Sequence, residues 1–212
     1  ISVNSTALLD LSDANNPKAL GNPTEGALLL WLNKHNINFE KIKENAERVD
    51  EIPFSTERKY MASLVKSQYL NGKKVLYLKG APEIVLALCS NIAGGETKHS
   101  INETLLKYQN QAMRTLAFAY QIVEDGETAI SDGKLTANNL TFMGVVAIAD
   151  PVRKEVPDAV NSCIEAGIDI KIVTGDTTAT AKEIGRQIGL WKENYGENNI
   201  ITGPDFAALS DE

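Results

Sequence analysis

The stretch Leu78-Lys79-Gly80-Ala81-Pro82-Glu83 marks the point where an apolar strand turns directly into a helix. Side chains alternate over residues 73–79, which predicts a strand with Lys79 at the end of one face. Gly80 lets a ligand or a second backbone approach this lysine, and Pro82 suits the first turn of a helix. Taken alone, a lysine at a strand end more often snorkels to solvent than binds a ligand.

The composition is that of an ordinary soluble globular protein. Of the 212 residues, 43% are hydrophobic and 23% are charged, which suffices for one substantial core or two modest ones. The longest apolar run, Ala27–Leu32, is too short to cross a bilayer. The net charge of −7 without a basic cluster argues against nucleic acid as a partner. Cys89 and Cys163 give no metal-site spacing. Because the chain begins with Ile, we expect an excised piece of a longer protein.

The strongest helix and hairpin signals lie in the first two thirds of the chain. Asn22 as N-cap, with Glu25 at the capping-box position, predicts a helix from Pro23. The dipeptide Asn71-Gly72 predicts a hairpin that joins strands over residues 60–70 and 73–79. The buried stripe of the helix is expected to comprise Ala27, Leu28, Trp31 and Leu32.

The sequence pattern changes near residue 142, where we place a domain boundary. Residues 144–150 are a continuous apolar strand, followed by an amphipathic helix that Gly167 closes. A strand over Ile168–Val173 and a helix from Thr178 to Gly189 follow. This alternation predicts a parallel βαβ unit, unlike the hairpin-rich first part.

Each of the two strands predicted in this second part ends in an aspartate, namely Asp150 before Pro151 and Asp176 within Thr174-Gly175-Asp176. The carboxyl ends of parallel strands are where open α/β sheets bind ligands, so two carboxylates there can hold Mg²⁺ or shape a phosphate site. A single aspartate after a strand usually caps the next helix. For this pair, function and capping are about equally favoured.

Six stretches of the sequence together resemble the cytoplasmic part of P-type cation-transporting ATPases, closest to the calcium-pump-like branch. They occur in that family's order and cover almost the whole chain. The stretches are Gly21–Leu28 (GNPTEGAL), Phe54–Lys59 (FSTERK), Lys79–Glu83 (KGAPE), Arg114–Ala117 (RTLA), Asp150–Arg153 (DPVR) and Thr174–Asp176 (TGD).

The resemblance implies an α+β nucleotide-binding domain over residues 1–142, with an antiparallel sheet flanked by helices. Residues 143–212 would form part of the phosphorylation domain, an α/β Rossmann-like segment of the haloacid-dehalogenase type. The parent would be an enzyme that couples ATP hydrolysis to cation transport, with calcium as the cation and Mg²⁺ as cofactor. The chain would be a soluble fragment from the cytoplasmic side of the cell membrane. Its partners would be ATP, the rest of the phosphorylation domain, and the actuator and transmembrane domains.

The resemblance also implies an ATP site. Phe54 would stack on adenine, Glu25 would accept a hydrogen bond from the base, and Lys79 with Gly80 would line the depth of the pocket. Lys59 and Arg114 would lie toward the ribose and phosphates. These roles suit the chemistry of the side chains, because a base offers a π-face and an amino group, and phosphates attract cations.

Each side chain also has a simpler interpretation. Phe54 could be a core aromatic residue, Glu25 only the capping-box partner, and Lys59 and Arg114 solvated charges. Taken one at a time, these interpretations are at least as probable as the binding roles. Their joint occurrence in family order favours the site.

The sequence departs from the family pattern in two respects. Thr56 stands where the calcium-pump pattern usually has a basic residue, which puts one phosphate contact in doubt. The family's Asp-Lys-Thr-Gly-Thr motif, whose aspartate is phosphorylated, is absent from this sequence. We therefore expect ATP binding without turnover. Asp150, Thr174, Gly175 and Asp176 would be remnants of the phosphoryl site.

Two other functions remain open. A phosphatase of the haloacid-dehalogenase type would need Asp150 as nucleophile, although Pro151 follows it and no Asp-x-Asp pattern is present. A non-catalytic interaction module is compatible with the acidic charge. In addition, the truncated βαβα segment should expose a sheet edge, which would allow self-association.

Overall fold

The structure is a computed structural model that describes residues 1–13, 16–111, 113–149, 152–174 and 178–209. The chain divides into two compact units. The first unit comprises Ile1–Ile101 and Thr115–Ile148, and the second comprises Asn102–Arg114 and Ala149–Glu212.

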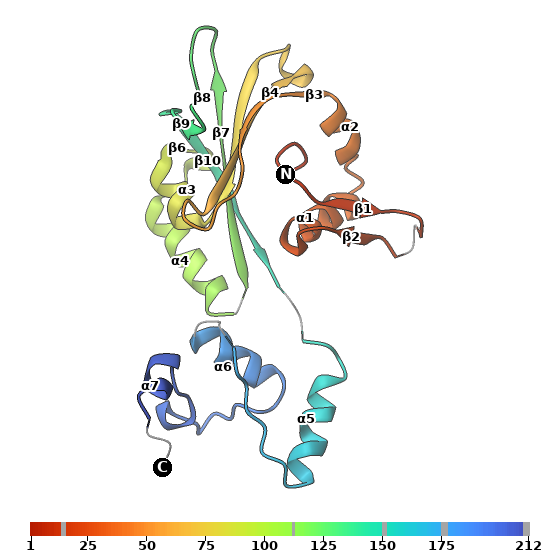
Figure 1. Ribbon diagram of the computed structural model, residues 1–212, viewed down its shortest axis with the longest axis vertical. Helices are drawn as coiled ribbons and strands as arrows, with labels where there is room; N and C mark the ends of the chain where they lie inside the picture. The colour runs from red at the N-terminus through yellow and green to blue at the C-terminus, as the bar shows by residue number, and fades with distance from the viewer. Residues whose placement is uncertain (14–15, 112, 150–151, 175–177, 210–212) are drawn as a thin grey trace. The chain divides into compact units, whose positions relative to one another are not determined.

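A six-stranded sheet forms the centre of the first unit (Figure 1). Its spatial order is β3-β4-β5-β7-β10-β6. The pairs β3–β4, β4–β5 and β5–β7 are antiparallel, whereas β6 pairs in parallel with β10. The sheet is therefore mixed rather than antiparallel throughout. The strands are β3 (Ala46–Ile52), β4 (Tyr60–Ser67), β5 (Lys74–Gly80), β6 (Cys89–Ile92), β7 (Arg114–Val123) and β10 (Leu140–Ile148).

The hairpin predicted at Asn71-Gly72 is confirmed. β4 and β5 pair from Tyr60 opposite Gly80 to Lys66 opposite Lys74. Asn71 and Gly72 adopt φ values of 54° and 77°, a left-handed conformation that these residue types tolerate well. The turn chemistry thus fixes the register that places Lys79 opposite Met61.

Gly80 is required by the close approach of another part of the backbone. A Cβ atom at this position would lie 2.5 Å from Lys59 O and 2.7 Å from Tyr60 Cα. The Ala81 amide donates a hydrogen bond to Lys59 O at 2.9 Å. The end of β5 is therefore packed directly against the start of β4, and α3 (Pro82–Leu88) begins immediately afterwards.

The remaining elements of the first unit surround this sheet. In Figure 1, α1 and α2 lie on one side of the sheet and α3 lies on the other. The short strands β1 and β2 form an antiparallel pair next to α1. The elements are β1 (Leu8–Asp10), β2 (Lys18–Leu20), α1 (Pro23–Lys34), α2 (Phe39–Glu44), β8 (Ile130–Ser131) and β9 (Lys134–Leu135), with 3₁₀ turns at Gln68–Leu70 and Ala93–Gly95.

Helix α1 begins as predicted, and its predicted buried stripe is confirmed for Leu28 and Leu32. The Asn22 side chain accepts hydrogen bonds from the amides of Thr24 and Glu25, which confirms the N-cap. Trp31 is 51% exposed, however, and Leu29 is buried in its place. Leu29 packs in a cluster with Ala7, Leu32 and Phe39. The stripe includes Leu29 because Ala7, which precedes α1 in the sequence, and Phe39, which follows it, supply apolar contacts there.

Apart from Arg114, the first residue of β7, the described residues of the second unit form helices and no assigned strand. Helix α4 (Lys98–Gln109) begins in the first unit and continues into the second. The amphipathic helix predicted before Gly167 and the helix predicted from Thr178 are confirmed as α5 (Val156–Glu165) and α6 (Thr178–Gln187). A 3₁₀ turn at Glu197–Asn199 and α7 (Gly203–Ala207) follow.

The strand predicted over Ile168–Val173 is not formed, and Val173 is 95% exposed. A parallel strand obtains its hydrogen bonds and its two covered faces from neighbouring strands, and the described part of this unit provides none. The sheet edge expected to mediate self-association in this segment is likewise not formed.

The apolar strand expected from residue 144 is the second half of β10. This strand begins at Leu140, crosses the domain boundary predicted at residue 142, and ends at Ile148 within the first unit. The division into domains 1–142 and 143–212 stays a prediction. None of the helices in the described ranges is long and apolar enough to span a bilayer.

Candidate functional site

Residues Val3–Ala7, here called the strap, run in an irregular conformation over the face of β4 and β5 that carries Lys79. The Asn4 side chain fixes the strap to both strands: its amide nitrogen donates to Tyr77 O at 3.1 Å, and its oxygen accepts from Ser63 Oγ at 3.3 Å. Asn4 and Ser63 are both buried. The strap is therefore part of the packed structure of the first unit.

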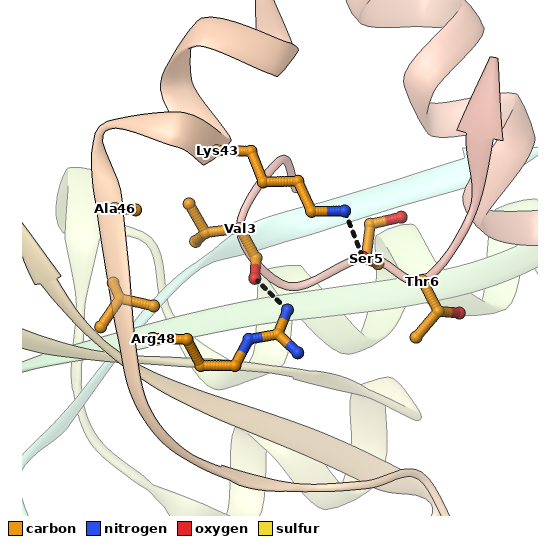
Figure 2. Close-up of a pocket in the computed structure, with 7 residues that line it drawn as sticks. Val3, Ser5, Thr6, Lys43, Ala46 and Arg48 are labelled. Carbon is orange, nitrogen blue, oxygen red and sulfur yellow. Dashed lines mark hydrogen bonds between the residues drawn. The ribbon is translucent and has the colours of Figure 1, made fainter.

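Three consecutive carbonyl groups of the strap each accept a hydrogen bond from a cationic side chain. These bonds run from Arg48 Nη2 to Val3 O at 3.5 Å, from Lys79 Nζ to Asn4 O, and from Lys43 Nζ to Ser5 O at 3.4 Å. Figure 2 shows the outer two, with Lys43 and Arg48 reaching the strap from α2 and β3. A cavity of about 400 Å³ lies between these two cations. Three separate elements thus hold one short segment.

Glu25, in the first turn of α1, binds the strap and Lys79 at the same time. Its Oε2 atom accepts hydrogen bonds from Thr6 N at 2.6 Å, Thr6 Oγ1 at 2.8 Å, Ala7 N at 3.0 Å and Ser5 Oγ at 3.3 Å. Its Oε1 atom accepts from Lys79 Nζ at 2.6 Å. Glu25 therefore does more than cap its own helix, because these bonds tie α1, the strap and β5 together.

The Glu25–Lys79 ion pair is shielded from solvent, with side chains that are 9% and 6% exposed. Burial alone would raise the pKa of Glu25. The hydrogen bond and charge of Lys79, together with the bonds from Thr6, outweigh burial and lower this pKa from 4.5 to about 2. Burial lowers the pKa of Lys79, and the Glu25 carboxylate opposes that shift. The carboxylate is thus ionised at neutral pH and compensates the buried ammonium group.

The other predicted site residues occupy the surface of the protein. Phe54 lies in the connection between β3 and β4 and is 58% exposed. Lys59 is exposed and has a φ of 57°, with its carbonyl directed at Gly80 and Ala81. Arg114 is the exposed first residue of β7. Among the predicted site residues, Glu25 and Lys79 are in direct contact. The backbone of Lys59 also lies against Gly80.

The predicted phosphoryl-site remnants are largely outside the described residues. This holds for Asp150, Gly175 and Asp176, so neither the carboxylate pair nor the nucleophile of a phosphatase has a described position. Thr174 is described and is exposed in an irregular segment. Within the described ranges, no group of three or more acidic, histidine or cysteine side chains is placed to hold a metal ion.

The strap and the side chains that bind it were not predicted from the sequence. Asn4, Thr6, Lys43 and Arg48 lie in stretches without a recognisable motif, and the bond from Lys79 to Asn4 joins residues 75 positions apart. One weak signal was present: Glu25 and Lys79 are opposite charges on elements predicted to be buried. A charge in such a place needs a partner.

Comparison with known proteins places the chain in a family. Residues 1–155 match the family model described as P-type ATPase, cytoplasmic domain N. The chain therefore belongs to the P-type ATPases. Within them, it belongs to the family defined by the cytoplasmic domain N of the cation ATPases.

The chain is similar to several curated proteins, each named as a calcium-transporting ATPase. It is 35% identical to one from Dictyostelium discoideum, over 99% of this chain and 19% of that protein. It is 34% identical to one from Listeria monocytogenes, over 92% of this chain and 22% of that protein. A plasma membrane-type protein from Oryza sativa is 31% identical, over 98% and 20%. The chain thus spans about a fifth of the length of these relatives.

Proposed function

We propose that this chain is the ATP-binding cytoplasmic part of a P-type ATPase that couples ATP hydrolysis to cation transport, with calcium as the cation. The observation that carries the proposal is the match of residues 1–155 to the cytoplasmic domain N. The names of the similar proteins support the choice of calcium. The rest of the parent pump would supply the membrane-spanning and actuator parts.

The proposed ATP site combines an exposed aromatic ring, exposed cations and the buried Lys79. Phe54 presents more than half of its surface to solvent, so its face is free to stack on a purine. Lys59 and Arg114 are exposed cations suited to the phosphates. Lys79 and Gly80 form the inner end of the site, with Glu25 behind the lysine.

In the parent pump, the phosphoryl group would be bound by residues of the second unit together with segments outside this sequence. The phosphorylated aspartate motif does not occur in these 212 residues, so the chain would bind ATP without hydrolysing it. Asp150, Thr174, Gly175 and Asp176 would contribute to the phosphoryl site, where Mg²⁺ neutralises phosphate charge. Residues beyond 148 would then belong to a Rossmann-like phosphorylation domain.

The proposal is tested by titrating the isotope-labelled chain with ATP and following amide shifts by NMR. Replacement of Phe54 by alanine should weaken ATP binding by at least about tenfold, equivalent to about 1.4 kcal/mol, because the stacking surface is lost. Tyr69→Ala is the matched control, since Tyr69 is another exposed aromatic residue, 61% accessible, in the 3₁₀ turn of the β4–β5 hairpin. Equal ATP affinity of the Phe54→Ala and wild-type chains would refute this site.

A further inference from the structure

The cavity of about 400 Å³ beside the strap has the dimensions of a small-molecule pocket. Its volume falls in the range of about 300–1,000 Å³ that is typical of ligand sites. The lining combines the hydroxyl groups of Ser5 and Thr6 with the apolar side chains of Ala46 and Val65. Thr6 and Arg48 are exposed residues, so a ligand can enter the cavity from solvent.

The charges around this cavity are positive. Of the described residues that line it, Lys43 and Arg48 are cations and none is acidic (Figure 2). Glu51 forms an ion pair with Arg48 Nη1 at 2.7 Å, whereas Lys43 forms no ion pair within the described part of the chain. The cavity therefore carries an uncompensated positive charge in a chain whose net charge is −7. Such a charge attracts an anion from solution.

The hydroxyl groups in the cavity wall already donate their hydrogen bonds inside the protein. Ser5 Oγ and Thr6 Oγ1 both donate to Glu25 Oε2, at 3.3 and 2.8 Å. Glu25 itself does not line the cavity, and Lys79 compensates its charge. A ligand would therefore find its hydrogen-bond donors on the two cationic side chains.

Lys43 and Arg48 have donors to spare. An ammonium group has three N–H donors and a guanidinium group has five. In the part of the chain that the structure describes, Lys43 donates to Ser5 O, and Arg48 donates to Val3 O and Glu51 Oε2. The two bonds to the strap are long, at 3.4 and 3.5 Å, against a usual N–H···O distance of about 2.9–3.0 Å. Both cations can thus bind an anion without giving up a strong bond.

We infer that this cavity is a binding site for the oxyanion group, phosphate or carboxylate, of a small organic molecule. The planar guanidinium group and the ammonium group suit a ligand group with several oxygen atoms. Ala46 and Val65 would contact the organic part, because burial of its apolar surface adds to the affinity. No residue of the proposed ATP site lines the cavity, so the inference does not depend on the proposed function.

Titration of the isotope-labelled chain with phenyl phosphate, followed by amide shifts, tests the site. We expect a dissociation constant of about 1 mM or tighter, with the largest shifts in the strap and at residues 43–48. Benzyl alcohol, which has a similar ring and no charge, should bind at least about tenfold more weakly. A parallel titration with benzoate shows whether phosphate or carboxylate is preferred, and either preference supports the site. Absence of saturable shifts at these residues with both anions would overturn the inference.

Lys43→Gln should weaken binding of the tighter anion by at least about fivefold, because a charged contact is lost. Lys41→Gln is the matched control, since Lys41 is an exposed lysine of the same helix and does not line the cavity. Its affinity should stay within about twofold of wild type. Equal losses in both variants, or no loss in Lys43→Gln, would overturn the inference.

Ala46→Leu tests the cavity while both cations and their bonds to the strap are retained. The larger side chain fills part of the volume and should weaken phenyl phosphate binding by at least about fivefold. Val49→Leu is the control, because Val49 is 46% exposed on the same strand and does not line the cavity. Unchanged affinity in Ala46→Leu would place the anion on the outer surface and overturn the inference. Displacement of phenyl phosphate by ATP that Phe54→Ala abolishes would assign the anion to the nucleotide site and would also overturn it.

Discussion

Glu25 and Lys79 show how a buried ion pair can be tolerated in this protein. Removing two charges from water is costly, and mutual attraction compensates only when the remaining donors and acceptors are also satisfied. Here Glu25 receives four bonds from the strap, and Lys79 donates to Asn4 O. No buried side-chain nitrogen or oxygen atom in the described ranges lacks a hydrogen-bond partner. Each member of the pair therefore depends on the other and on the strap.

The depressed pKa of Glu25 predicts a loss of stability in acid. The carboxyl has a pKa of about 2 in the folded chain against 4.5 normally. Its stabilising contribution is thus fully present above about pH 4.5 and is lost as the pH falls toward 2, amounting to about 3 kcal/mol. Urea unfolding between pH 6 and pH 2 should show this loss in the wild-type chain. Glu25→Gln/Lys79→Gln should lack this component, and an identical pH dependence in both chains would contradict the prediction.

At the scale of elements, the junction between β5 and α3 depends on the absence of a side chain at Gly80. The β4–β5 hairpin sets the register, and the backbone at Lys59–Tyr60 then comes within contact distance of Gly80. The sequence indicated that Gly80 allows close approach of a ligand or a second backbone. The structure identifies the backbone of Lys59 and Tyr60 as one group that occupies this space.

Gly80→Ala should therefore destabilise the chain in the absence of nucleotide. The new methyl group would lie 2.5 Å from Lys59 O, so the start of β4 must move, at a cost of about 1–3 kcal/mol. Gly196→Ala is the matched control, because its φ of −123° suits alanine and no atom lies within 4 Å of the added Cβ. Chemical denaturation measures both variants. Equal stability of Gly80→Ala and Gly196→Ala would show that the junction adjusts freely.

At the scale of the whole molecule, the two units differ in what stabilises them. The first unit has a continuous sheet with fully buried strand residues, including Val65, Leu76 and Leu78. Its last strand ends at Ile148, close to the end of the family match at residue 155. In the second unit, Ile168 and Val173 are exposed in a segment without strand pairing. The first unit accordingly contains most of the cooperative core.

Hydrogen exchange should reveal this difference. Amides of Val65 and Leu78 are paired within the sheet, so we expect exchange only through global unfolding, whereas the amides of Ile168–Val173 should exchange within seconds to minutes. Mass spectrometry of peptides from the intact chain measures both regions under one condition. Protection of Ile168–Val173 comparable to that of β5 would instead indicate a paired strand, as the sequence pattern predicted.

The sequence by itself determined the elements that depend on local interactions. The Asn22 cap, the Asn71-Gly72 turn and the start of a helix at Pro82 were all predictable, because the groups that form them lie within a few residues of one another. The contact of Gly80 with the backbone of Lys59 and Tyr60 joins more distant residues, and the structure identified it. The ordered motifs also predicted the family, which the match over residues 1–155 confirmed.

Only the tertiary structure decided which face α1 buries, whether Ile168–Val173 pairs, and what surrounds Lys79. These outcomes depend on contacts between distant segments. Leu29 replaces Trp31 in the core because Ala7 and Phe39 pack there. A parallel strand forms only beside neighbouring strands. The environment of Lys79 is set by Asn4 and Glu25, which lie 75 and 54 positions away, so no local pattern encodes it.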